Sequence, residues 1–226
     1  MLVGAGLREP VEDLAQTFGK EHDVRIEADY AGGEVLLSRL KLARKGEVYI
    51  PGDRHYVDQA DQAELVLGRQ PVCYFVPTIL VRKGNPKGIR GLNDLVKPEV
   101  RLGLGDAKAC AIGRQSKRLF EKNGLAWAEV EKNLKFQSLT VNELGMQIQT
   151  GSLDAVIVWD AVAKQYAAHG EEAPIPKEQN LISTVEAAVL KCARDRELAE
   201  KFIEFARSAR GQEILAKHGY RTAPPE

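Results

Sequence analysis

The sequence predicts an α/β protein whose mostly parallel sheets are flanked by helices and divided between two lobes. Short runs rich in β-branched residues alternate with amphipathic helical stretches along the 226-residue chain. This alternation is typical of parallel sheets covered by helices on both faces. Residues 83–86, Lys-Gly-Asn-Pro, give the strongest turn signal, and the alternation restarts after them. A length of 226 residues allows one large domain or two lobes, and the restart favours two lobes.

The first part of the chain alternates between short strands and helices. Val24, Ile26 and Ala28 alternate with charged residues, as in a strand with one polar face. The other elements follow from apolar spacing and from turn residues such as Gly46. We expect strands at residues 2–4, 24–28 and 48–50, and helices around residues 11–18, 35–43 and 56–63.

The second part begins with the longest apolar run, residues 72–81, which Pro77 interrupts. Proline cannot donate to a strand ladder, so this run is predicted to be a kinked, edge or crossover strand. Beyond the turn at residues 83–86 the same patterns return. We expect strands at residues 100–104, 135–138, 155–158 and 185–190, and helices at residues 111–123, 141–149 and 161–168, followed by two C-terminal helices.

Composition excludes several classes of protein. The 32 basic and 32 acidic residues cancel, which argues against bulk attraction to nucleic acid or to an anionic membrane. No run of about 18 apolar residues is present, so no stable membrane insertion is expected. Three cysteines without C-x-x-C spacing make a structural zinc site or a disulfide framework unexpected. No signal peptide is recognised at Met1, which leaves a cytoplasmic protein and a processed, exported one as alternatives.

Ligands of open α/β sheets bind where strands end and helices begin. Four such junctions, residues 4–8, 31–34, 107–111 and 140–143, are rich in small residues. Small residues let a ligand approach the backbone, and helix N-termini offer unpaired N–H groups that suit an anion. Each junction has a structural alternative: a tight turn for the glycines, helix caps for Thr140 and Asn142, and a capping box from Thr140 to Glu143.

Catalytic interpretations are weaker. Cys110, at a helix start beside Lys108, is either a nucleophile with a lowered pKa or a small buried residue. Asp53 and His55 could form a ligand-binding pair, but a helix-capping aspartate beside a solvent-facing histidine is the better explanation. No complete dinucleotide fingerprint and no phosphate-binding P-loop are present, so no nucleotide is implied. Trp159 and Asp160 end the apolar strand, where Asp160 is either a cap or a ligand contact.

Several ordered segments together resemble a known family. These are the opening Gly-Ala-Gly-Leu, Tyr-Ala-Gly-Gly at residues 30–33, and residues 46–53, 81–86, 103–108, 151–158 and 211–215. The whole chain resembles the periplasmic molybdate- and tungstate-binding proteins of ABC importers, which have the type II periplasmic binding protein fold.

The resemblance implies two lobes that close by a hinge over a small ligand. Lobe one would hold residues 1–83 and 188–226, and lobe two residues 84–187, with crossover strands near residues 77–84 and 184–190. It implies a molybdate- or tungstate-like oxyanion as ligand, delivery to an ABC permease, a periplasmic or other extracytoplasmic location, a monomer, no cofactor and no catalysis. The ligand-binding residues expected from the junctions and the resemblance are Gly6, Leu7, Arg8, Gly32, Gly33, Glu34, Lys108, Cys110, Ala111, Ile112, Thr140, Val141, Asn142, Trp159 and Asp160.

The chain departs from the family pattern at the ligand positions. The family typically has serine where this chain has Gly6 and Gly33, and tyrosine where it has Trp159. Its third turn usually reads proline-alanine-glycine, whereas residues 111–113 read Ala-Ile-Gly. Glu34, Asp160 and Cys110 leave a metal ion or a thiophilic oxyanion as alternative ligands. Two alternative functions remain: a ligand-sensing regulatory domain and an enzyme that uses Cys110. The absence of a recognisable helix-turn-helix segment in the sequence argues against the regulatory domain.

Overall fold

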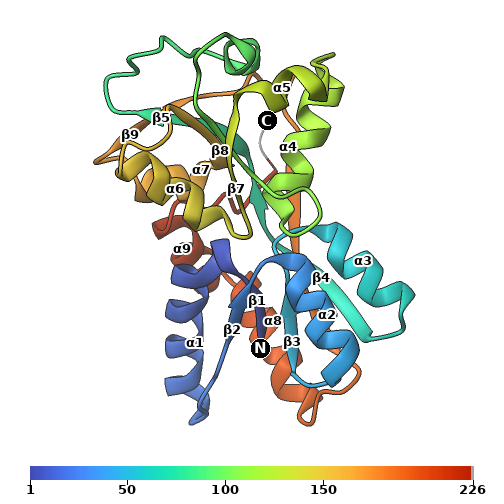
Figure 1. Ribbon diagram of the computed structural model, residues 1–226. Helices are drawn as coiled ribbons and strands as arrows, with labels where there is room; N and C mark the ends of the chain where they lie inside the picture. The colour runs from blue at the N-terminus through green and yellow to red at the C-terminus, as the bar shows by residue number, and fades with distance from the viewer. Residues whose placement is uncertain (225–226) are drawn as a thin grey trace. The chain divides into compact units, whose positions relative to one another are not determined.

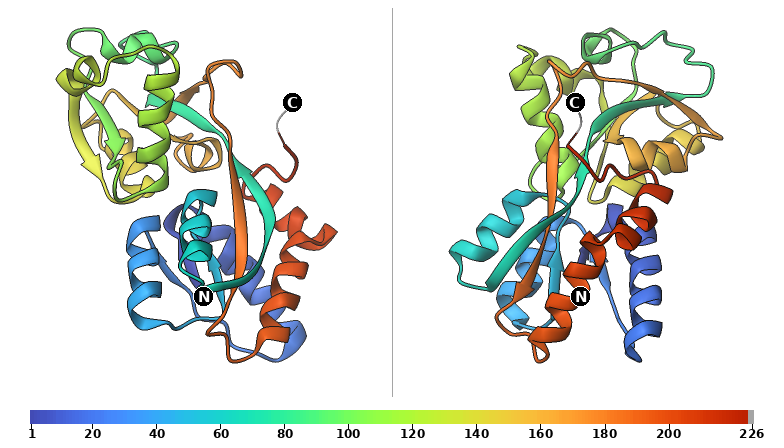
Figure 2. Two further views of the ribbon diagram at one scale, coloured as in Figure 1. Left: turned by 90° about the vertical axis from the view of Figure 1, so that its right-hand side faces the viewer. Right: turned by 180° about the vertical axis from the view of Figure 1, so that it is seen from behind.

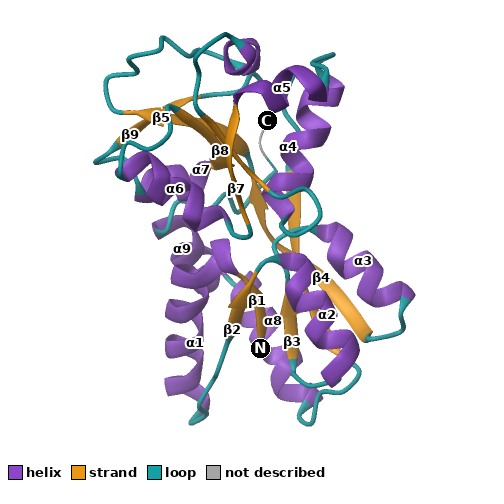
Figure 3. Ribbon diagram, in the orientation of Figure 1, coloured by secondary structure: helices purple, strands orange, loops and turns teal. Residues whose placement is uncertain are grey.

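The computed structural model describes residues 1–224, and these form two compact α/β units (Figures 1 and 3). Unit 1 comprises Met1–Phe75 and Ser183–Glu226, and unit 2 comprises Val76–Ile182. Each unit has its own five-stranded sheet. The predicted two-lobed α/β class is therefore confirmed.

The sheet of unit 1 has the strand order β2-β1-β3-β10-β4. β1, β2 and β3 are mutually parallel, whereas β10 pairs antiparallel with both β3 and β4. Figure 2 shows the long ribbon of β4 and β10, which are paired along all of β10. The strands are β1 (Leu2–Gly4), β2 (Asp29–Ala31), β3 (Val48–Ile50), β4 (Val66–Phe75) and β10 (Ser183–Leu190).

The helices of unit 1 bury one apolar face each. In the first helix Val11, Leu14 and Phe18 are all buried, as their spacing predicts. Asp195 and Ser208 cap two of the helices with side-chain hydrogen bonds. The helices are η1 (Ala5–Leu7), α1 (Arg8–His22), α2 (Gly33–Ala43), α3 (Arg54–Gln62), α8 (Arg196–Arg207) and α9 (Ala209–Lys217).

The sheet of unit 2 repeats this plan, with the order β7-β6-β8-β5-β9. β7, β6 and β8 are parallel, and β5 is antiparallel to β8 and β9. The central strand β8 is buried throughout. The elements are β5 (Pro77–Arg82), η2 (Leu92–Val96), β6 (Leu102–Gly105), α4 (Ala111–Lys122), α5 (Trp127–Asn133), β7 (Leu134–Ser138), α6 (Val141–Gln149), β8 (Ala155–Trp159), α7 (Asp160–Gln165) and β9 (Gly170–Ala173).

The structure differs from the expectations in four respects. Both sheets are mixed rather than mostly parallel, because the strands on either side of the chain crossings run antiparallel to their neighbours. Residues 24–28 are not a strand, since no strand pairs with them among residues 1–224. The short elements α5 and β9 were not expected. The chain passes between units at Phe75–Val76 and Ile182–Ser183, because β5 pairs within unit 2 and β10 within unit 1, whereas the expected boundaries lie at residues 83/84 and 187/188.

Candidate ligand-binding site

The carboxyl ends of the three parallel strands of unit 1 meet at one edge of its sheet. β1 leads into η1 and α1, β2 into α2, and β3 into α3. Gly6, Leu7, Arg8, Gly32, Gly33 and Glu34 therefore lie on neighbouring junctions of this edge. Leu7 is 1% exposed, so its side chain belongs to the core. The carbonyl of Gly6 accepts a hydrogen bond from the hydroxyl of Tyr220.

The packing of Tyr56 explains why residue 33 has no side chain. A Cβ atom at Gly33 would lie 2.3 Å from Cε2 of Tyr56 and within 2.8 Å of two further ring atoms. Tyr56 projects from α3 and is buried. The serine that the family typically has here would therefore collide with a packed aromatic ring. At position 33 the chain can therefore offer a ligand only backbone groups.

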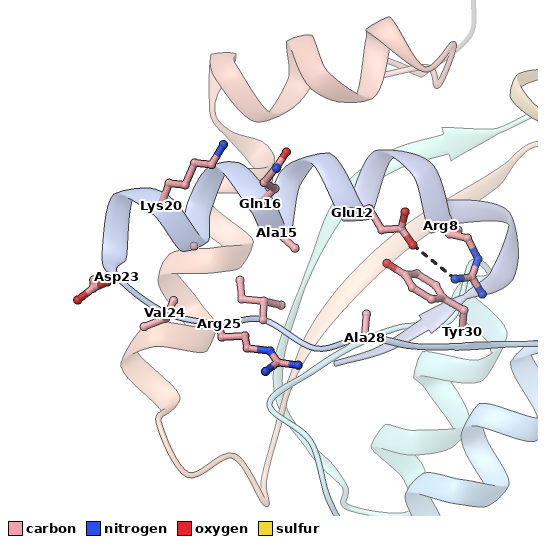
Figure 4. A pocket seen from close by; sticks show the side chains of 12 residues that line it. Arg8, Glu12, Ala15, Gln16, Lys20, Asp23, Val24, Arg25, Ala28 and Tyr30 are labelled. Atoms are coloured by element: carbon pink, nitrogen blue, oxygen red, sulfur yellow. Dashed lines mark hydrogen bonds and ion pairs between the residues drawn. The ribbon is translucent and has the colours of Figure 1, made fainter.

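Arg8 is held in a groove beside α1. Its guanidinium carbon lies 4.2 Å from the centre of the Tyr30 ring, and its Nη1 lies 3.4 Å from Oε1 of Glu12 (Figure 4). A cation over an aromatic face is attracted by the ring quadrupole. Burial, followed by the nearby Glu12 carboxylate, raises the pKa of Tyr30 to about 12. The charge of Arg8 is thus engaged within unit 1 in this conformation.

Asp53 and Ser183 form a buried polar pair at the same edge, which the sequence-based list of site residues omits. Asp53 caps α3 by accepting the N–H of His55 at 2.8 Å, which confirms the expected cap. Its second oxygen accepts the Ser183 hydroxyl at 3.1 Å. Asp53 could have been found from the sequence, because it ends the stretch of residues 46–53 that resembles the family. Ser183 lies 130 positions away, and no local pattern links it to Asp53.

In unit 2 the corresponding edge is formed by the ends of β6, β7 and β8. The start of α4 packs directly against the end of β6: a Cβ at Gly113 would lie 2.4 Å from the Gly105 carbonyl oxygen and 2.3 Å from that of Asp106. Residue 113 is therefore restricted to glycine. The first internal hydrogen bond of the helix runs from the Arg114 N–H to the Cys110 carbonyl. The preceding N–H groups, including those of Ala111 and Ile112, have no partner within the helix.

Cys110 is buried and does not have the properties of a nucleophile. It is 3% exposed, and its Sγ lies 3.8 Å from the carbonyl oxygen of Ser138. Burial raises the pKa of its thiol to about 11, and the N–H groups of Gly113 and Ile112 oppose this only in part. The alternative with a lowered pKa is therefore wrong, because removal from water outweighs the helix N-terminus. The structure matches the other alternative, a small buried residue.

The α6 junction presents polar groups that the helix does not use. Thr140 occupies the N-cap position but its side chain makes no capping hydrogen bond. Glu143 accepts the N–H of Leu139 at 3.2 Å instead of that of Thr140, so the expected capping box does not form. The Oδ1 atom of Asn142 is buried without a hydrogen-bond partner. A buried amide oxygen in this state is costly unless a ligand or water supplies the missing partner.

The remaining expected residues lie on the same edge. Trp159 ends β8 and is 2% exposed, and Asp160 begins α7 and accepts the Ala161 N–H at 2.9 Å. Ala111, Ile112 and Val141 have buried side chains, so only their backbone could contact a ligand. Lys108 is exposed beside them. The junction residues thus fall into two groups, one on each unit.

The side chain of Ser138 was not expected to matter. Ser138 ends β7 in register with Gly105, on the face of the sheet that α4 covers. It is 1% exposed, and its Oγ has no hydrogen-bond partner in the described part of the chain. Ser138 therefore adds a hydroxyl to the polar groups beneath the start of α4. A lone serine at the end of a strand gives no sequence signal that distinguishes it from other serines.

Two α/β units, each with ligand-type junctions at the carboxyl edge of its sheet and joined by two chain crossings, define a solute-binding protein of the two-lobed type. The chain belongs to the family described as bacterial extracellular solute-binding protein, whose model matches residues 1–221.

Relatives with known names agree with this assignment. A binding protein of Haemophilus influenzae is 26% identical over 99% of this chain and 90% of its own length. The molybdate-binding protein ModA of Mycobacterium bovis is 24% identical over 87% of this chain and 74% of its own length. The predicted resemblance to the molybdate-binding proteins is therefore confirmed, and the matched relatives are binding proteins.

Solved structures show the same fold. The periplasmic molybdate-binding protein of Azotobacter vinelandii has a TM-score of 0.81 at 16% identity, covering 100% of this chain and 99% of the other. The sulfate-binding protein SubI of Mycobacterium tuberculosis has a TM-score of 0.86 at 15% identity, covering 99% and 86%. The type II periplasmic binding protein fold is thereby confirmed. None of the helices in residues 1–224 combines the length and the apolar character needed to cross a membrane.

Proposed function

We propose that this protein binds a small tetrahedral oxyanion, molybdate or tungstate in the first place, and delivers it as a monomer to an ABC import permease from an extracytoplasmic compartment. Backbone N–H groups at the starts of α4 and α6 would bind the anion together with the unit 1 junctions. Binding would close the two units around it by a hinge. The molybdate-binding relative and the molybdate- and sulfate-binding structural neighbours support this class of ligand.

The observation that carries the proposal is the start of α4. The contact between Gly105 and Gly113 holds the first turn of α4 at the carboxyl edge of the sheet, where the N–H groups of Ile112 and Gly113 face the Cys110 sulfur and that of Ala111 is not used by the helix. Such N–H groups bear partial positive charge and bind anions without a formal charge. Thr140 and Asn142 on the neighbouring junction have polar atoms that the helix leaves unused.

Four carboxylates of these junctions are engaged by backbone N–H groups, which favours an anion over a metal ion. Asp53, Asp106, Glu143 and Asp160 each accept one or more backbone N–H groups. A carboxylate engaged in this way stabilises its own loop, and binding a cation would require it to give up those bonds. Cys110, the thiol considered for a thiophilic ligand, is buried. The oxyanion therefore fits these residues better than the metal alternative.

The test is a melting-temperature panel with molybdate, tungstate, sulfate, thiosulfate, phosphate and divalent cations, followed by calorimetry of the anions that bind. A ligand at one hundred times its Kd stabilises the folded state by about 2.7 kcal/mol. We expect molybdate and tungstate to give the largest increases. A response to cations alone would overturn the proposal, and a preference for sulfate would keep the oxyanion class but change the ligand.

Gly113→Ala tests where the anion binds. The new Cβ would displace the start of α4 from Gly105, so we expect a loss of stability and, in the protein that remains folded, at least a tenfold loss of anion affinity. Lys117→Ala, an exposed change later in α4, is the matched control and should bind normally. Normal anion binding by Gly113→Ala would place the site elsewhere.

A further inference from the structure

Residues 24–28 have the alternating sequence of a strand, but no strand within residues 1–224 pairs with them. Their apolar members Val24, Ile26 and Ala28 are half-buried, and the charged residues between them are exposed. Figure 4 shows this segment running alongside α1 as a loop up to the start of β2. β2 follows directly at Asp29 and pairs with β1. The alternation of side chains therefore extends β2 on its amino-terminal side, although only its three residues are paired.

A slot lies between this segment and the start of β3. Its volume is about 460 Å³, and it is bordered by residues 24–27 on one side and 46–48 on the other. The slot is also lined by Phe18 of α1 and by Leu198, Ala199 and Phe202 of α8. Phe18, Ala199 and Phe202 are almost completely buried. The lining is therefore mixed: the apolar side chains from α1 and α8 are joined by the charged residues Arg25, Glu27, Glu47, Arg194 and Asp195.

The dimensions of the slot match a β-strand. A strand in a packed sheet occupies about 160 Å³ per residue, from a rise of about 3.3 Å, a spacing of about 4.8 Å and a layer of about 10 Å. The slot therefore accommodates about three residues. β1 already lies between β2 and β3, with Leu2 in register with both Asp29 and Tyr49. If β1 were extended on its amino-terminal side, before Met1, the added residues would lie between residues 24–27 and residues 46–48.

We propose that this slot receives an extended strand of about three residues, joined to the nitrogen of Met1, which lengthens β1 and turns residues 24–28 into part of β2. The Met1 nitrogen already donates to the carbonyl of Glu27 at 2.5 Å, and Asp29 donates to the Met1 carbonyl at 2.9 Å. These two bonds continue the ladder between β1 and β2 into the slot.

The covalent link decides between a joined strand and a separate peptide. Three residues bury too little surface to compensate for the translational and rotational freedom that a separate peptide loses on association. A covalent link removes most of that cost by raising the effective concentration. The slot lies at the amino ends of β1 and β3, whereas the candidate ligand residues lie at the carboxyl ends. This proposal therefore does not depend on the proposed function.

The experiment compares three forms of the protein: the chain as it stands, the chain with Thr-Ile-Val added before Met1, and the chain with Gly-Pro-Gly added. We expect only Thr-Ile-Val to slow amide exchange of residues 25–28 at least tenfold. It should also raise the melting temperature by a few degrees, the shift expected for a modest gain in a chain of this size. In the glycine-proline extension the proline lacks a ladder donor and the glycines have no side chains to pack in the slot.

Leu198→Asp, which places a charge in the slot, provides a second check. It should abolish the gain from Thr-Ile-Val while changing the unextended chain less, and the oxyanion response should be unchanged in both. Equal exchange rates for the two extensions would overturn the proposal. Protection by free Thr-Ile-Val peptide, without a larger effect when it is attached, would also overturn it and would assign the slot to a separate partner.

Discussion

At the scale of single residues, the candidate ligand positions of this chain are determined by the packing behind them. Gly33 is the clearest case, because the ring of Tyr56 occupies the space of a side chain. In an open helix, replacing glycine with alanine stabilises by up to about 1 kcal/mol. At Gly33, the overlap of the new Cβ with the Tyr56 ring should make the same replacement destabilising. The absence of a serine hydroxyl at this junction is thus coupled to an aromatic residue of α3.

Gly33→Ala is therefore expected to destabilise the protein by about 1–3 kcal/mol, because the Tyr56 ring must move. Urea unfolding measures the change. In a Tyr56→Leu background the same substitution should cost less, which a double-mutant cycle detects as a coupling energy. Gly68→Ala, with no atom within 4 Å of the new Cβ, is the control. Equal costs at positions 33 and 68 would contradict the role assigned to Tyr56.

The chemistry of Cys110 gives a second prediction at this scale. With the pKa of its thiol raised to about 11 by burial, only about one thiol in a thousand is ionised at pH 8. We expect Cys192, which is only partly buried, to react with a thiol reagent before Cys110 does. Mass spectrometry of labelled peptides distinguishes the two. Labelling of Cys110 at the rate of a free thiol in the folded protein would contradict the buried role.

At the scale of secondary-structure elements, Asp154 connects the start of β6 to the turn before β8. Its carboxylate accepts two hydrogen bonds from Arg101, one from the backbone N–H at 3.0 Å and one from Nη2 of the side chain at 2.9 Å. Nε of Arg82 lies 3.7 Å from the same carboxylate. Arg101 also donates to the Gly151 carbonyl at 3.1 Å. The Gly-x-x-Asp-Ala segment that resembles the family therefore has a structural role, since Asp154 holds two strands and a turn together.

Asp154 should make the protein sensitive to acid. Burial alone would raise the pKa of its carboxyl, but the hydrogen bonds and charge of Arg101 outweigh burial, so the pKa lies below its usual value. The carboxylate therefore stabilises the fold fully above the unfolded pKa, about 3.9. That contribution is lost as the pH falls through the lower, folded pKa.

Asp154→Asn should lower the free energy of unfolding at pH 7 by about 1.5–3 kcal/mol, the range for a hydrogen bond to a charged group. The difference from the unchanged protein should shrink toward pH 3, as measured by urea unfolding across the pH range. Glu129→Gln breaks an exposed pair with Lys132 and should cost no more than about 1 kcal/mol. A pH-independent loss at position 154 would show that the charge is not responsible.

The same scale shows what the sequence could predict. α6 and β8 were predicted to within about a residue because their apolar spacing and turn residues are local. The strand expected at residues 24–28 was wrong, because alternation describes a face and does not supply a partner strand. The helix α5 was missed because only Val130 and Asn133 of its seven residues are buried.

The candidate site was predictable to the same extent. Strand ends and small residues located the four junctions, which the structure places at the carboxyl edges of the two sheets. The contacts of individual side chains could not be predicted. Tyr56 against Gly33, and Ser183 on Asp53, join residues far apart in sequence. The burial that raises the pKa of Cys110 likewise depends on tertiary packing.

At the scale of the whole molecule, two chain crossings connect units that each have a complete sheet and core. A ligand that contacts both units shifts the population toward a closed form only by its differential affinity for that form. In the proposed mechanism the oxyanion gains contacts from unit 1 only on closure. Shifting the population from almost fully open to almost fully closed requires the ligand to bind the closed form about 5.5 kcal/mol more tightly than the open form. A charged ligand bound by several N–H donors can supply this difference in binding free energy.

Solution X-ray scattering tests this mechanism. We expect saturating molybdate to lower the radius of gyration, because closure brings the two units together, and Gly113→Ala to need at least a tenfold higher molybdate concentration for the same decrease. The control variant Lys117→Ala should respond as the unchanged chain does. Binding by calorimetry without any change in scattering would leave the oxyanion site standing but would contradict hinge closure. The same dependence on molybdate concentration in Gly113→Ala as in the unchanged chain would mean that the anion acts on the units without the start of α4.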